Sequence, residues 1–268
     1  MTIALRAENL VRVFPSAAGD VHACDGIDLE LHAGELLAVR GASGAGKTTL
    51  LNLLGVLDRP TSGRVWIGDV DTTDLPETEL ALIRRDALGF VFQSFGLIPV
   101  LSARENVELP LRIAGTAPDE RDERVTEALA MVGLAAHTEQ RPAELSGGQQ
   151  QRVGIARAIV ARPRVLIADE PTGQLDSRTA ATIMDLLGEL AHGQGLATII
   201  STHDPLLVAR ADRVVEIHDG RIVGSAPHRE TDAATAAPVR APSAVPEPNG
   251  QPPRTRAEAR RGRSASGS

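Results

Sequence analysis

Residues 41–48 have the residue types and the spacing of a loop that binds phosphate. Their sequence, GASGAGKT, fits the pattern G-x-x-x-x-G-K-[ST] and lies between an apolar run, 36–39, and a leucine-rich helical stretch, 50–57. Glycines let backbone N–H groups close around phosphate oxygens, and the following helix adds the positive end of its dipole. Lys47 is the only lysine in the chain, which suits a site that needs a compact ammonium. We interpret the segment as a nucleotide loop in which Thr48 binds Mg²⁺; the alternative is a glycine-rich turn before a helix.

Two adjacent carboxylates, Asp169 and Glu170, follow the apolar run 165–168. The period of a strand would turn them to opposite faces, so they could do different work. One could hold Mg²⁺ through water, and the other could orient or deprotonate an attacking water molecule. His203 follows another apolar run, 198–201, and α/β sheets bind ligands at the carboxyl ends of their strands. A solvent-facing strand cap and a surface histidine are the alternatives, and the phosphate loop favours the functional interpretation.

The elements that must position these residues alternate short β-branched runs with helical stretches. This pattern favours an α/β fold with a largely parallel sheet and crossover helices. The run 165–168 is apolar and the run 198–201 is centred on Ile199 and Ile200, as expected for central strands buried on both faces. Residues 214–223 are predicted to form a hairpin with an Asp-Gly turn. Further strands are predicted at residues 27–31, 36–39, 65–67 and 89–92.

Composition excludes several classes of protein. The chain has 268 residues, of which 42% are hydrophobic, a single cysteine, Cys24, and a net charge of -7. A disulfide framework and a multi-cysteine zinc site are therefore excluded, and a basic polyanion binder is not expected. Aromatic residues make up 2% of the chain, so a stacking platform for single-stranded nucleic acid is poorly supplied.

The two ends of the chain lead to further expectations. No apolar run is long enough to span a membrane. Glu8 and Arg12 lie where a signal peptide would have its apolar core. A cytoplasmic protein is therefore expected, unless a partner carries it to a membrane. Residues 229–268 are mostly Ala, Pro, Arg, Ser and Gly, which predicts a disordered tail after a folded domain of residues 1–228. The arginine-rich run 254–264 could touch anionic lipid or nucleic acid, but a solvated tail is the simpler interpretation.

The segment LSGGQ, residues 145–149, resembles the signature of ATP-binding cassette (ABC) ATPases. That family has, in order, a phosphate loop, a glutamine, the signature, an acidic strand end, an Asp-bearing loop and a histidine. The same six features occur here in that order, at residues 41–48, Gln93, 145–149, 169–170, 175–176 and His203. The resemblance implies hydrolysis of ATP with Mg²⁺. It also implies a P-loop NTPase fold of the ABC type, with a RecA-like core, an antiparallel β subdomain and a helical signature subdomain.

The signature itself predicts a second phosphate site. Ser146 is a good N-cap with Gln149 three residues on, and a glycine-rich helix N-terminus attracts anions. In the family, the phosphate loop of one subunit and the signature of the other enclose one ATP across a head-to-tail dimer. This chain has one copy of each, so the resemblance implies a homodimer that holds two nucleotides.

The family implies a role for each matching residue. Glu170 would be the general base, His203 would contact the γ-phosphate, and Gln93 would contact Mg²⁺ or the lytic water. Phe14 would stack on adenine, and Asp176 would link the two sites of the dimer. Metal contacts are expected from Thr48, Gln93 and Asp169. The remaining nucleotide contacts are expected from Gly41, Ser43, Gly44, Ala45, Gly46, Lys47, Thr48, Thr49, Ser146, Gly147, Gly148 and Gln149.

Segments such as 55–63, 88–99 and 168–173 are similar to the lipoprotein-release and macrolide-export branch of the family, LolD- and MacB-like. Members of that branch pair with an FtsX/MacB-like transmembrane permease, which implies a protein peripheral to the inner face of the cell membrane that energises export. Four of the apolar residues between Gln93 and Glu105 are expected either to line the groove for the permease's coupling helix or to be ordinary core. They are Leu97, Ile98, Val100 and Leu101.

Three alternatives stay open. An FtsE-like ATPase, which regulates cell-wall hydrolysis through a permease-like partner without transport, shares most of these motifs. A nucleic-acid or translation ABC ATPase would usually carry two cassettes or zinc cysteines, and no specific nucleic-acid partner is expected. A P-loop kinase would have no use for the LSGGQ segment.

Overall fold

The structure is a computed structural model that describes residues 2–17 and 19–227. The predicted tail, 229–268, and its arginine-rich run, 254–264, lie outside the described residues, so the division of the chain at residue 228 stays a prediction. Among the described helices, none is both long enough and apolar enough to cross a membrane.

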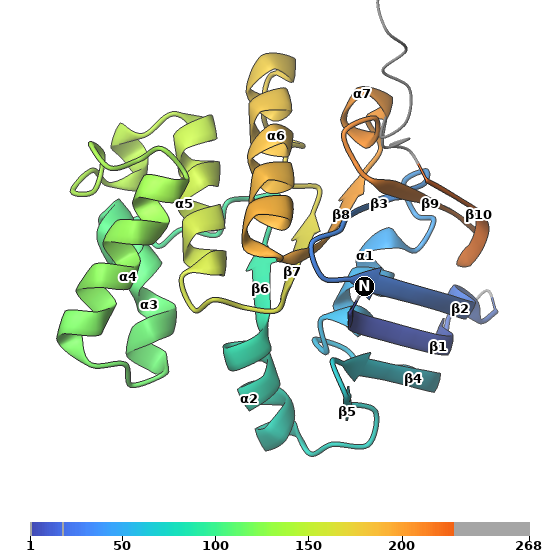
Figure 1. The fold of residues 1–268 in the computed structure, drawn as a ribbon. Helices are drawn as coiled ribbons and strands as arrows, with labels where there is room; N and C mark the ends of the chain where they lie inside the picture. Colours follow the sequence, from blue (N-terminus) through green and yellow to red (C-terminus); the bar gives the residue numbers. More distant parts are fainter. Residues whose placement is uncertain (1, 18, 228–268) are drawn as a thin grey trace, which may run out of the picture. The chain divides into compact units, whose positions relative to one another are not determined.

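A six-stranded sheet forms the centre of the molecule (Figure 1). All neighbouring strands run parallel except the edge pair, which is the predicted hairpin with its Asp219-Gly220 turn. Both turn residues have positive φ, 46° and 73°, as a tight hairpin of this kind requires. From edge to edge the strands are β10 (Arg221–Pro227), β9 (Arg213–His218), β3 (Leu36–Arg40), β8 (Ala197–Thr202), β7 (Val165–Asp169) and β6 (Leu88–Val91).

The central strands are mostly apolar because the sheet is buried on both faces, and β8 also buries Thr198, Ser201 and Thr202. Along β3, Leu36 and Ala38 pack into one hydrophobic cluster, whereas Leu37 and Val39 pack into the other. The first cluster includes residues of helices α3 (Ala103–Ile113), α4 (Pro118–Met131), α5 (Gly147–Ile159) and α6 (Ser177–Gln194). The second includes α1 (Lys47–Leu54) and the antiparallel strands described next.

An antiparallel sheet of four strands packs against the second cluster. Its order is β2 (Val21–His32), β1 (Ile3–Phe14), β4 (Ser62–Ile67) and β5 (Val70–Asp71). The sequence predicted only parts of β2 and β4 and missed β1. The reason lies in the strand itself, since its register shifts between Ala7 and Leu10 and Asn9 has a φ of 46°, which breaks the alternation of apolar residues.

Helices α3, α4 and α5 gather at the opposite end of the molecule from the antiparallel strands (Figure 1). Two of them begin with a capping box, Ser102 with Glu105 for α3 and Ser146 with Gln149 for α5. The remaining elements are short or connecting. They are α2 (Glu77–Ala87), the 3₁₀ turn η1 (Pro142–Glu144) and α7 (Pro205–Val208).

The predicted helix after the phosphate loop is shorter than expected. It ends at Leu54, with Gly55 as C-cap, so Leu57 lies beyond it and is 48% exposed. Gly55 is packed so closely that a Cβ there would lie 2.6 Å from the Phe90 ring, and the chain turns away at Val56, whose φ is 50°.

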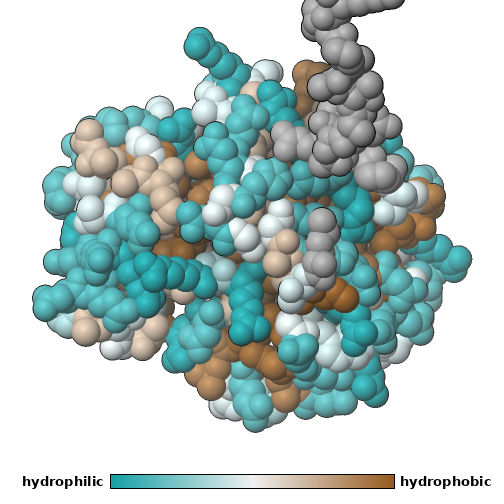
Figure 2. Space-filling model, in the orientation of Figure 1, coloured by the Kyte–Doolittle hydropathy of each residue, from teal (hydrophilic) through white to brown (hydrophobic). Residues whose placement is uncertain are grey.

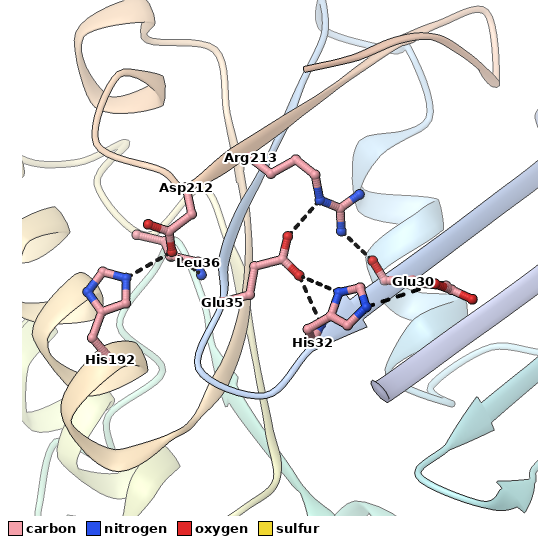
Figure 3. A network of polar contacts seen from close by, with 7 residues as sticks. All are labelled: Glu30, His32, Glu35, Leu36, His192, Asp212 and Arg213. Carbon is pink, nitrogen blue, oxygen red and sulfur yellow. Dashed lines mark hydrogen bonds and ion pairs between the residues drawn. The ribbon is translucent and has the colours of Figure 1, made fainter. Parts of the chain in front are cut away.

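A polar network fixes the amino-terminal ends of β3 and β9 (Figure 3). The Glu35 carboxylate accepts hydrogen bonds from the Arg213 guanidinium at 2.6 Å and from the His32 backbone N–H at 2.9 Å. Asp212 accepts one from the Leu36 backbone N–H at 2.9 Å. Burial alone would raise the pKa of Glu35, but its hydrogen bonds from Arg213 and His32 hold that pKa below its ordinary value. The network therefore anchors these strands at the ends away from the candidate site.

Candidate nucleotide-binding site

A cavity of about 930 Å³ opens at the carboxyl ends of the central strands. The predicted residues that line it each follow a strand: the phosphate loop follows β3, Gln93 follows β6, Glu170 follows β7 and His203 follows β8. Parallel strands bring their carboxyl ends to one edge of a sheet, and that edge is where α/β folds bind ligands. From the loop, the cavity is lined by Ser43, Gly44, Gly46, Lys47, Thr48 and Thr49.

The phosphate loop needs glycine at two positions for steric reasons. Gly46 has a φ of 102°, and a Cβ on it would lie 2.1 Å from the Ala23 carbonyl oxygen. A Cβ on Gly41 would lie 2.5 Å from the Ile217 carbonyl oxygen. Gly41 and Ala45 lie behind the lining, where the Ala45 carbonyl accepts a hydrogen bond from Gly220 N–H at 3.1 Å. No side chain caps the N-terminus of α1, so its first turn can present backbone N–H groups to an anion.

Lys47 brings a buried cation to the cavity. Its side chain is 8% exposed, and Nζ donates hydrogen bonds to the carbonyl oxygens of Gly41 at 2.8 Å and Ala42 at 3.1 Å. The same Nζ lies 3.8 Å from Glu170 Oε1. A cation at the start of the helix and a carboxylate across the cavity therefore face each other.

The two acidic residues do point to different partners, but the predicted reason was wrong. The strand β7 ends at Asp169, and Glu170 does not continue it, because its φ is 46°. This left-handed turn sends the Glu170 carboxylate to His203, whose Nδ1 lies 3.0 Å from Oε2 and 3.1 Å from Oε1. Asp169 Oδ1 instead accepts a hydrogen bond from Ser201 Oγ at 2.5 Å. Sequence reasoning missed Ser201, since a lone serine in a strand gives no signal.

Gln93 lies against the loop that follows the acidic strand end. A Cβ on Gly173 would lie 2.8 Å from Gln93 Nε2, so glycine at this position lets the amide approach the backbone. The contact joins two segments 80 residues apart, and only the folded chain reveals it.

Phe14 borders the cavity rather than lining it. It ends β1 and is paired with Val21, which is a lining residue. Phe14 is 39% exposed, and the Arg12 guanidinium lies 4.5 Å from the centre of its ring. One face of the ring is thus covered by a cation, and stacking of adenine on this ring stays a prediction.

The signature and Asp176 lie outside the lining of this cavity. Ser146 Oγ accepts a hydrogen bond from Gln149 N–H at 3.3 Å, and Gln149 Oε1 accepts one from Ser146 N–H at 2.8 Å, which is the predicted capping box. A Cβ on Gly148 would lie 2.5 Å from Thr179 Cγ2, and Leu175 Cδ2 is the nearest neighbour of one on Gly147. Asp176 caps α6, and hydrogen bonds, first of all from the Thr179 hydroxyl, lower its pKa. The signature therefore does not contribute to this cavity, and its use as a second phosphate site stays a prediction.

A phosphate loop, a buried lysine and a carboxylate–histidine pair in one cavity define a P-loop nucleoside triphosphatase. A family model described as ABC transporter matches residues 24–173. The chain is 46% identical over 243 residues to the macrolide export ATP-binding/permease protein MacB of Burkholderia pseudomallei, which covers 91% of this chain and 37% of that protein. It is 51% identical over 213 residues to the pyoverdine export ATP-binding/permease protein PvdT of Pseudomonas fluorescens, which covers 80% of this chain and 31% of that protein. The chain spans about a third of the length of these curated relatives.

Solved structures agree with this assignment. The fold is similar to a dimeric structure of MJ0796, a bacterial ABC transporter cassette, with a TM-score of 0.77 and 40% identity over 84% of this chain and 99% of that one. A post-hydrolysis dimer of MJ0796 bound to ADP and Pi has a TM-score of 0.76 and the same identity. The chain belongs to the ABC transporter family and is an ATP-binding, ATP-hydrolysing cassette of that family. The predicted α/β fold of the ABC type is confirmed.

Proposed function

We propose that ATP binds in the cavity with its phosphates on residues 43–49 and that Glu170 and His203 act at the γ-phosphate. The observation that carries this proposal is the convergence of Lys47, Glu170 and His203, with Lys47 Nζ 3.8 Å from Glu170 Oε1 and His203 Nδ1 3.0 Å from Glu170 Oε2. Lys47 is placed to neutralise phosphate charge. Glu170 is placed to accept the proton of a water molecule as that water attacks the γ-phosphorus and the bond to the ADP oxygen breaks.

The donor set of the cavity fits Mg²⁺. The Thr48 hydroxyl and the Gln93 amide oxygen line the cavity and are hard oxygen donors, which this ion prefers. Asp169 is not among the lining residues and its Oδ1 is hydrogen-bonded to Ser201, so a contact from its carboxylate to Mg²⁺ stays a prediction. Within the described part of the chain, no three His, Cys, Asp or Glu side chains converge as a metal site, so phosphate oxygens and water would complete the coordination. When bound, Mg²⁺ would neutralise charge that develops on the phosphates.

We further propose that two copies of the chain enclose two nucleotides. The signature lies outside the cavity lining, yet its capped, glycine-rich helix N-terminus suits an anion. A second copy in head-to-tail orientation supplies Ser146 to the phosphates held by Lys47. The dimeric structures of MJ0796 support the formation of a dimer.

The test is the Glu170→Gln variant with and without ATP. The amide keeps the shape of the side chain but cannot accept the proton, so hydrolysis stops while binding persists. Light scattering is expected to show an ATP-dependent dimer, and the Glu170→Gln, Lys47→Ala double variant is the control that stays monomeric. Hydrolysis by Glu170→Gln at the wild-type rate would remove Glu170 from the role of base.

We propose that the loop before α3 meets a membrane permease. Asn106 is fully buried, and its side chain accepts from Ile98 N–H at 2.8 Å and donates to the Leu101 carbonyl oxygen at 3.1 Å. This anchor holds Ile98 and Val100 outward, at 41% and 71% exposure, whereas Leu97 packs against the core. Figure 2 shows one face of the protein, which is mostly hydrophilic with scattered hydrophobic patches.

Charge substitution tests this surface. Val100→Asp is expected to abolish co-purification with the cognate permease and to leave basal ATPase activity unchanged. Ile113→Asp is the matched control, because Ile113 is 74% exposed but lies at the far end of α3. Equal permease binding by both variants would contradict the assignment.

We propose export as the use of this ATPase, at the inner face of the membrane with an FtsX/MacB-like permease. Support comes from two relatives whose names describe export ATP-binding/permease proteins. An FtsE-like regulatory role without transport is the competing proposal. Reconstitution with the permease distinguishes them, since export requires ATP-dependent movement of a cargo and regulation does not.

A further inference from the structure

Ser201 lies between the two acidic residues of the site. It is fully buried in β8, in register with Asp169 on β7. Its Oγ lies 2.5 Å from Asp169 Oδ1 and 2.9 Å from Glu170 N. We propose that Ser201 is a positioning residue for ATP hydrolysis, which fixes the Asp169 carboxylate and the backbone of Glu170 at the same time.

The directions of these two hydrogen bonds follow from the groups involved. The Glu170 N–H can only donate, so Ser201 Oγ accepts it and gives its own proton to Asp169 Oδ1. Each atom of the hydroxyl is thereby used once. The bond to Oδ1 orients the Asp169 carboxylate and leaves its other oxygen, Oδ2, without a contact to Ser201.

Glu170 is the residue that depends most on this support. Its φ of 46° lies in the left-handed region, which a non-glycine residue keeps only when its surroundings hold it. Ser201 holds its N–H, and its carbonyl oxygen accepts from Gly173 N–H at 3.0 Å. With both ends of the residue fixed, its carboxylate faces His203 Nδ1 at 3.0 Å and Lys47 Nζ at 3.8 Å.

This inference rests on the proposed roles of Asp169 and Glu170, and two isosteric variants test it. Ser201→Thr keeps a hydroxyl and Ser201→Val replaces it by a methyl group of similar size, so the difference between them measures the hydroxyl alone. Ser201→Val is expected to lower kcat roughly 10- to 100-fold relative to Ser201→Thr, since a hydrogen bond to a charged group is lost. KM for ATP is expected to change less than kcat, because Lys47 and the rest of the phosphate loop are untouched.

A second readout does not depend on activity. Amide hydrogen exchange of a peptide that spans residues 168–173 is expected to be faster in Ser201→Val than in Ser201→Thr, since the Glu170 N–H loses its acceptor. Thr198→Val is the matched control on the same strand, because Thr198 is equally buried but its hydroxyl lies 3.4 Å from the Leu196 carbonyl oxygen, away from the site. It is expected to keep the wild-type kcat and the exchange rate of 168–173.

Equal kcat and equal exchange in Ser201→Val and Ser201→Thr would overturn the inference. If added bulk inactivates both, Ser201→Ala decides: a wild-type kcat overturns the inference, and a loss of kcat with faster exchange at 168–173 supports it. Failure of the proposed function is distinguishable, because Glu170→Gln would then hydrolyse ATP whatever residue occupies position 201.

Discussion

Replacing Gly46 by alanine tests whether the observed loop is the one that binds phosphate. The new Cβ would lie 2.1 Å from the Ala23 carbonyl oxygen, where real Cβ atoms stay beyond 3.0 Å. The loop or the facing strand β2 must therefore move by roughly 1 Å, which costs about 1–3 kcal/mol in a packed structure, and the positive φ adds strain of about 1–2 kcal/mol. We expect Gly46→Ala to lose about 30-fold or more in affinity for ATP.

Gly44→Ala is the matched control in the same loop. Gly44 also has a positive φ, 82°, but a Cβ there would meet nothing within 4 Å. Within the chain only backbone strain of about 1–2 kcal/mol is added, and this strain alone corresponds to a loss of ATP affinity of about 5- to 30-fold.

Titration calorimetry with ATP measures both affinities, and circular dichroism checks that each variant is folded. The expected order is wild type, then Gly44→Ala, then Gly46→Ala. Binding by folded Gly46→Ala that equals or exceeds binding by Gly44→Ala would refute the reasoning.

Two further predictions concern the signature and the network at the other end of the sheet. Ser146→Ala removes the cap of α5, so it is expected to lower the free energy of unfolding by about 1 kcal/mol in urea titrations. It is also expected to abolish the ATP-dependent dimer. Ser146→Thr keeps a capping hydroxyl and is expected to restore the stability. Glu35→Gln is expected to cost about 2 kcal/mol, or roughly 4–8 °C in Tm, at pH 7. The pKa of Glu35 is lowered on folding, so the stabilisation that its carboxylate provides is complete above its unfolded pKa near 4.5. This stabilisation is lost as the pH falls through the folded pKa. The melting curves of Glu35→Gln and wild type should therefore converge in acid.

Local patterns explain what could be predicted from the sequence. The phosphate loop, the Ser146 capping box and the Asp219-Gly220 turn each depend on residues within a few positions of one another. The burial on both faces predicted for 165–168 is likewise observed, since Leu166 packs into one core and Ile167 into the other. The residues that determine each of these features are close together in the sequence, so the features could be predicted from it.

Long-range contacts account for most of what was missed. Ser201 meets Asp169 only because β7 and β8 pair in a particular register. The strand β1 was missed because the irregularity at Asn9 breaks its alternation. The left-handed turn at Glu170 was missed because the alternation of side chains along a strand does not indicate where the strand ends.

The central claim is that each ATP site is completed by a second copy of the chain. Its most direct test mixes two variants in the Glu170→Gln background, Lys47→Ala and Ser146→Asp. Aspartate keeps the N-cap but repels phosphate, so neither variant alone should dimerise with ATP. A mixed pair has one intact site, made of Lys47 from one chain and Ser146 from the other. We predict that tagged Lys47→Ala retains Ser146→Asp only when ATP is present, with one nucleotide per pair. An ATP-dependent dimer of either variant alone, or no retention in the mixture, would contradict the claim.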